Sequence, residues 1–143
     1  ITTDKTPFSL DKALIMKTGT DVSLIATGTM THQALVAAEQ LAKQGISAEV
    51  VHVPVIKPLD AATILTSAEK TKHVVTIEEH QIIGGLGSAV AELLSEHTPT
   101  PMKRIGMQDR FGESGEMTEL FKHFGLHADN IAKVAEHLIK TST

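Results

Sequence analysis

Apolar residues in this chain fall into short runs, separated by longer segments in which they recur every three or four positions. Near-continuous runs of roughly four to eight apolar residues are typical of strands buried on both faces of a sheet. Such runs predict strands over residues 13–16, 22–26, 48–53 and 74–77, and a further short strand is expected over residues 103–107, after the turn at 98–101.

Helices are predicted in the longer segments, because their apolar residues lie on one face at helical spacing. Thr29 or Thr31 can cap the first helix, and Gly45 supplies its left-handed stop. Asp60 can cap a second helix that runs to about residue 71, and a shorter helix is expected over residues 116–124. The apolar stripes are Ala34, Leu35, Ala38, Leu41 and Ala42; Leu86, Ala89, Val90, Leu93 and Leu94; and Ile131, Val134, Ala135, Leu138 and Ile139.

The alternation of strands with helices predicts an α/β fold, in which a mainly parallel sheet carries helices on both faces. Only the turn Thr18-Gly19-Thr20-Asp21 separates the first two strands, so we expect them to pair as antiparallel neighbours, with the first at the edge. We interpret residues 1–12 as a linker or arm, 13–140 as one domain and 141–143 as a frayed tail.

The composition is that of an ordinary globular chain, with 41% hydrophobic and 21% charged residues among 143. The net charge is −4 and no basic cluster is present, which argues against a nucleic-acid partner. The absence of cysteine excludes disulfides, thiolate metal ligands and a cysteine nucleophile, and it fits a reducing compartment. We therefore expect a cytoplasmic protein.

Hydropathy gives no sign of a membrane or secretory segment. No apolar run approaches the ~20 residues that a membrane helix needs. The N-terminal residues lack the basic and apolar regions of a signal peptide, and Ile1 stands where an initiator Met would. We expect a chain without a membrane partner, cut or cloned from a longer polypeptide.

Polar residues follow the predicted strand 74–77 at the position where α/β sheets usually bind ligands and partners. They are Glu78, Glu79 and His80, and at most two of them can share a site, because alternate strand residues point to opposite faces. A His beside carboxylates suits acid–base chemistry, but the sequence shows no third group to orient it. We therefore predict no catalytic residue here. Instead of a catalytic site, these residues would form a solvated strand end or a set of hydrogen bonds across a subunit contact.

Three glycines, Gly84, Gly85 and Gly87, come next and open a predicted helix. They could let backbone N–H groups at the helix N-terminus approach an anion. However, their spacing is neither GxGxxG nor that of a P-loop, and a close strand–helix turn also requires small residues. We favour the structural interpretation.

A second candidate segment, Asp109, Arg110 and Phe111, places charges and a rare aromatic residue in one predicted loop. Arginine–carboxylate pairing at an interface anchored by Phe111 is one use, and local capping and core filling is the other. The eight histidines are scattered, so we expect no metal site, and there is no GxSxG motif for serine catalysis.

Three segments together resemble the C-terminal domain of the transketolase family: ATG at 26–28, VTIEEHQIIGGLGSAVAELL at 75–94 and GMQDRFGESG at 106–115. The resemblance implies a three-layer α/β/α sandwich on a mixed five-stranded sheet with one antiparallel strand. In that family the N-terminal and middle domains hold thiamine diphosphate and magnesium. This chain lacks the GDG motif for them, so we expect it to bind no cofactor alone.

The resemblance also implies a role. We expect the structural and interface domain of a thiamine-diphosphate-dependent transketolase, inactive alone, with the N-terminal and middle domains and a second copy of the enzyme as partners. Glu78, Glu79, His80 and the glycines would face a neighbouring domain, with Asp109 and Arg110 as supports. The alternatives are a docking domain of a 2-oxo acid dehydrogenase β subunit, a 1-deoxyxylulose-5-phosphate synthase-like enzyme, or a small-anion regulatory site at the glycine turn.

Overall fold

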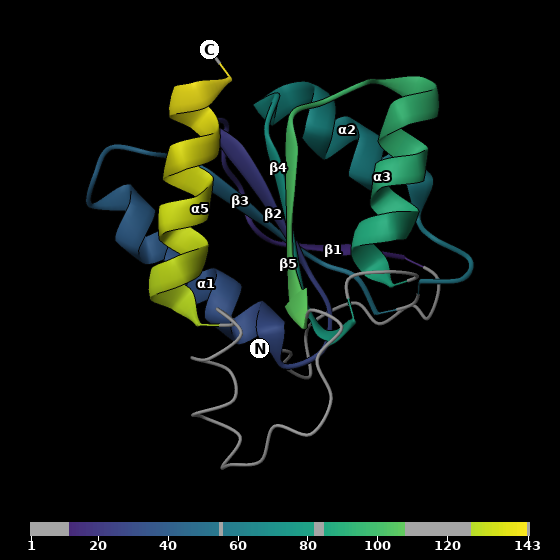
Figure 1. Ribbon diagram of the computed structural model, residues 1–143, viewed down its shortest axis with the longest axis horizontal. Helices are drawn as coiled ribbons and strands as arrows, with labels where there is room; N and C mark the ends of the chain where they lie inside the picture. The colour runs from purple at the N-terminus through teal and green to yellow at the C-terminus, as the bar shows by residue number, and fades with distance from the viewer. Residues whose placement is uncertain (1–11, 55, 82–84, 108–126, 143) are drawn as a thin grey trace.

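The computed structural model describes residues 12–54, 56–81, 85–107 and 127–142 (Figure 1). Within them, five strands form one sheet in the order β1-β3-β2-β4-β5. The strands β2 to β5 run parallel, and β1 is antiparallel to β3. The strands are β1 (Leu14–Lys17), β2 (Val22–Ala26), β3 (Ala48–His52), β4 (Val74–Gln81) and β5 (Met102–Met107).

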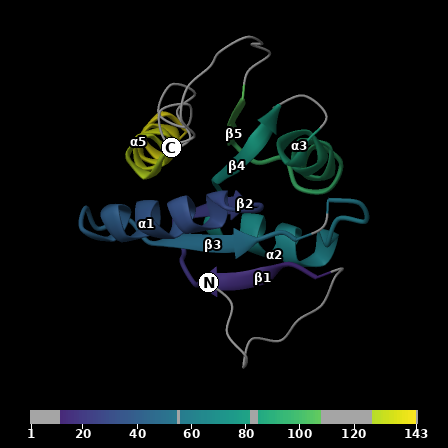
Figure 2. The same ribbon diagram turned by 90° about the horizontal axis from the view of Figure 1, so that it is seen from below.

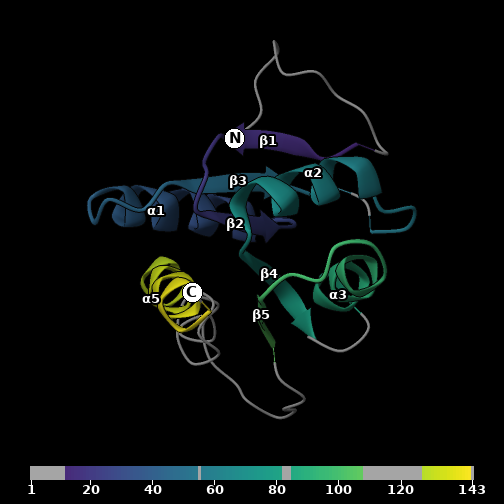
Figure 3. The ribbon, with the colours of Figure 1, turned by 90° about the horizontal axis from the view of Figure 1, so that it is seen from above.

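Two helices cover each face of the sheet in the described part of the chain. Figures 2 and 3 show α1 and α5 on one side and α2 and α3 on the other. The predicted α/β/α sandwich on a mixed sheet with one antiparallel strand is therefore confirmed. The helices are α1 (Met30–Ala42), α2 (Ala61–Thr71), α3 (Leu86–His97) and α5 (Ala128–Thr141).

The core is aliphatic and divided between the two faces. All five residues of β2 are buried, as expected for a central parallel strand. Alternate strand residues pack against different helices: Leu24 lies with α1 and α5, and Ile25 lies with α2 and α3. Among the described residues, no helix is both long and apolar enough to cross a membrane.

The predicted pairing of the first two strands is wrong, because β1 pairs with β3 instead of β2. Strand β2 pairs with β3 on one side and with β4 on the other, so β1 cannot pair with it. In the turn between β1 and β2, the backbone N–H of Asp21 donates a hydrogen bond to the backbone carbonyl of Ser47 at 2.7 Å. A Cβ at Gly19 would lie 2.2 Å from the carbonyl carbon of Ala48. The glycine therefore lets the chain cross close under the start of β3.

The prediction for the start of α1 holds in position but not in its side-chain hydrogen bond. The predicted glycine at the end of α1 and the predicted cap of α2 are confirmed. Thr29 is the N-cap residue, but neither it nor Thr31 caps the helix with its side chain. Gly45 has φ +80° at the C-terminal end. Asp60 accepts hydrogen bonds from the Thr63 backbone N–H at 3.3 Å and hydroxyl at 2.7 Å. In the stripe predicted for α1, Ala42 is exposed.

Candidate functional site

The polar residues singled out in the sequence lie at the carboxyl ends of the parallel strands, on the side to which the β5 arrow points in Figure 1. Strand β4 continues through all three of Glu78, Glu79 and His80, so these residues belong to the strand and not to a loop. The N-termini of α1 and α3 meet this edge of the sheet.

Glu78 is 1% exposed and points toward α3. Its two carboxylate oxygens accept hydrogen bonds from the backbone N–H groups of Leu86 at 2.9 Å and Gly87 at 2.7 Å. The N-cap residue of α3, Gly85, offers no side chain for this purpose. A carboxylate at a helix N-terminus also meets the positive end of the helix dipole. Glu78 therefore caps α3 from the end of the neighbouring strand.

Glu79 points to the opposite face, toward α1, as the strand alternation predicted. Its Oε1 atom accepts a hydrogen bond from the Thr29 hydroxyl at 3.2 Å. Gly28, with φ +60°, brings the backbone close to the same oxygen, which a Cβ would approach to 3.0 Å. The adjacent glutamates thus join the end of β4 to one helix on each face.

His52, at the end of β3, belongs to the same edge and was not predicted. Its Nδ1 atom lies 2.7 Å from the hydroxyl of Thr31, and burial lowers the pKa of the imidazole. Burial therefore disfavours the charged imidazolium, and the ring nitrogen shares a hydrogen bond with the Thr31 hydroxyl. The signal in the sequence was a polar side chain within the predicted strand 48–53, near its carboxyl end.

Of the three glycines in the turn, the structure describes Gly85 and Gly87, and Gly87 lies at a closely packed position. A Cβ at Gly87 would lie 2.8 Å from Cδ of Arg104 and 3.0 Å from the hydroxyl oxygen of Thr76. Two backbone amides at the start of the helix, those of Leu86 and Gly87, bind Glu78. Gly84 lies outside the described residues, as do Asp109, Arg110 and Phe111.

The described residues at this edge make contacts within the domain. Both glutamates are engaged by helices, and within residues 12–54, 56–81, 85–107 and 127–142 no three His, Cys, Asp or Glu residues come together to hold a metal ion. The arrangement joins the end of β4 to α3 on one face of the sheet and to the start of α1 on the other.

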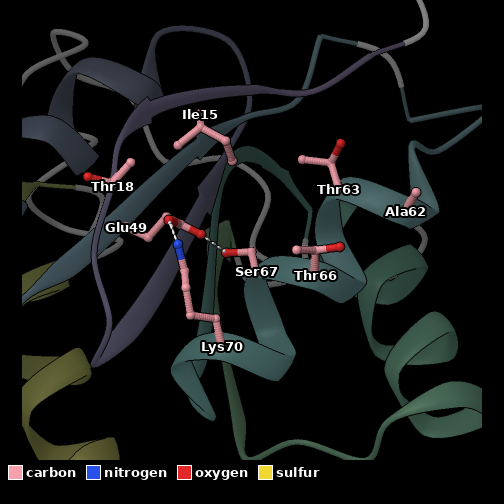
Figure 4. Close-up of a pocket in the computed structure, with 8 residues that line it drawn as sticks. All are labelled: Ile15, Thr18, Glu49, Ala62, Thr63, Thr66, Ser67 and Lys70. Carbon is pink, nitrogen blue, oxygen red and sulfur yellow. Dashed lines mark hydrogen bonds and ion pairs between the residues drawn. The ribbon is translucent and has the colours of Figure 1, made fainter.

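A groove of about 390 Å³ lies between β1 and α2, outside the segments that the sequence singled out (Figure 4). Glu49, which is 2% exposed, accepts from the Ser67 hydroxyl at 2.6 Å and from the Gly19 backbone N–H at 3.3 Å, and it pairs with Lys70. The groove is lined by Ile15, Thr18, Glu49, Ala62, Thr63, Thr66, Ser67 and Lys70.

Comparison with known proteins places the chain in a family. The model for the transketolase C-terminal domain matches residues 11–131. The chain belongs to the transketolase C-terminal domain family. A 6-deoxy-6-sulfo-D-fructose transketolase subunit from Clostridium sp. is 47% identical over 138 residues, which cover 96% of this chain and 43% of that protein. The resemblance found in the sequence is thereby confirmed.

A further relative and a solved structure are also similar to this chain. A 1-deoxy-D-xylulose-5-phosphate synthase from Heliobacterium modesticaldum is 38% identical over 93% of this chain and 21% of its own length. A solved split-gene transketolase, described as an inactive β4 tetramer, has a TM-score of 0.94 at 39% identity over 99% of this chain and 46% of that one. This transketolase C-terminal domain thus spans less than half of these relatives' lengths.

Proposed function

We propose that this domain is the structural and interface domain of a thiamine-diphosphate-dependent transketolase that transfers a two-carbon ketol unit between sugar phosphates. The observation that carries the proposal is the use of both motif glutamates inside the fold, Glu78 by α3 and Glu79 by α1. Because both carboxylates bind within the fold and fix the end of β4, their role in this proposal is to shape a contact surface and not to take part in the reaction.

The cofactor belongs to other domains in this proposal. Magnesium bound to a diphosphate needs carboxylate or carbonyl oxygens from the protein. The described residues hold no cluster of three His, Cys, Asp or Glu residues, and the amides at the start of α3 bind Glu78. These residues do not fit the cofactor, so we derive no step of the reaction from it.

The partners are the N-terminal and middle domains of the same enzyme, which works as a homodimer in the cytoplasm. The end of β4, with Glu79 and His80, faces one of these domains, and Asp109 and Arg110 assist from beyond the described residues. Support comes from the lengths of the relatives and from the solved split-gene transketolase, which is described as an inactive β4 tetramer.

The test compares the whole enzyme that contains this domain with the domain alone. With thiamine diphosphate and magnesium, we expect the whole enzyme to transfer a ketol unit from a ketose phosphate to an aldose phosphate. The domain alone should neither turn over these substrates nor bind thiamine diphosphate at micromolar concentration by calorimetry. Turnover or such binding by the domain alone would overturn the proposal.

A second candidate is a whole enzyme of the 1-deoxy-D-xylulose-5-phosphate synthase type, because one such enzyme is 38% identical across nearly the whole domain. The role of the domain would be the same. Mass spectrometry of the products distinguishes the two, since formation of 1-deoxy-D-xylulose 5-phosphate without ketol transfer would favour the synthase. No contact among the described residues favours a dehydrogenase docking domain or an anion site.

A further inference from the structure

We draw no further inference here: the strongest candidate, the groove between β1 and α2 that Ile15 and the ion pair of Glu49 with Lys70 line, carries nothing, because the two charges already bind each other and nothing in the structure shows what covers its apolar side.

Discussion

Glu78 and Gly87 are joined by a hydrogen bond of 2.7 Å between a buried carboxylate and the second backbone N–H of α3. Nine positions separate the two residues, and between them the chain turns from the end of β4 into the helix. The negative charge of Glu78 thus substitutes for the side-chain cap that Gly85 cannot provide. This contact fixes the end of β4 against one face of the domain.

Replacing Glu78 by Ala should strongly destabilise the domain. Two helix N–H groups would lose a charged acceptor in a buried place, and bonds to charged groups contribute about 1.5–3 kcal/mol each. We expect the free energy of unfolding in urea to fall by about 2–4 kcal/mol. The adjacent Glu79→Ala is the matched control, because its partner Thr29 is exposed, and it should cost less than about 1 kcal/mol. Similar losses for the two variants would contradict the capping role of Glu78.

Two glycines should respond very differently to replacement by Ala. A Cβ at Gly19 would meet the backbone of Ala48 at 2.2 Å, so the crossing of the chain below β3 would have to open. A Cβ at Gly45 would meet nothing within 4 Å, and only its positive φ is unfavourable. We expect a loss of about 3 kcal/mol or more for Gly19→Ala. Gly45→Ala should lose about 1–2 kcal/mol. Thermal unfolding of both variants measures the difference, and an equally mild effect at Gly19 would contradict this crossing.

The ion pair between Lys70 and Glu49 should contribute to the stability of the domain. Lys70→Met keeps the length of the side chain but leaves the carboxylate of Glu49 without its cation. Because Lys70 is partly exposed and water can replace it in part, we expect a loss of about 1–2 kcal/mol in urea unfolding. Lys103→Met, at an exposed position on β5, is the control and should change stability by less than about 0.5 kcal/mol. The double variant Lys70→Met with Glu49→Gln should recover part of the loss.

The sequence predicted the strands of the sheet well, because burial on both faces leaves a strong apolar signal. It did not predict that β1 would pair with β3. A turn as short as 18–21 allows either a hairpin or a crossing, and the choice depends on contacts such as Gly19 with Ala48 that are distant in sequence. The order of the strands depends on the whole sheet, because β2 pairs with β3 on one side and with β4 on the other and so has no free edge for β1.

The sequence predicted those features of the candidate site that depend on neighbouring positions, and not those that depend on distant contacts. Strand alternation correctly separated Glu78 from Glu79, since it depends only on neighbouring positions. The partner of Glu79, Thr29, lies 50 positions away along the chain, so the sequence could not supply it. The partners of Glu78, in contrast, lie only eight and nine positions further on. One signal was available: a helix that starts Gly85-Leu86-Gly87 has no capping side chain of its own, and a buried Glu before it meets that need. The groove beside Ile15 left no sequence pattern, because its lining comes from three separate elements.

Stability should also depend on pH through His52. Burial lowers the pKa of this imidazole in the folded state, so the unfolded chain binds a proton more readily. As the pH falls below the ordinary value of about 6.5, the unfolded state gains protons first and the free energy of unfolding decreases until the folded pKa is passed. Above about pH 6.5 this contribution is fully present. We expect the urea midpoint to fall between pH 7.5 and 5.5 by more in the wild type than in His52→Gln, whose amide can still bond Thr31 but cannot titrate. His137→Gln, at an exposed position on α5, should keep the wild-type pH dependence. An unchanged slope in His52→Gln would show that other groups cause the loss at low pH.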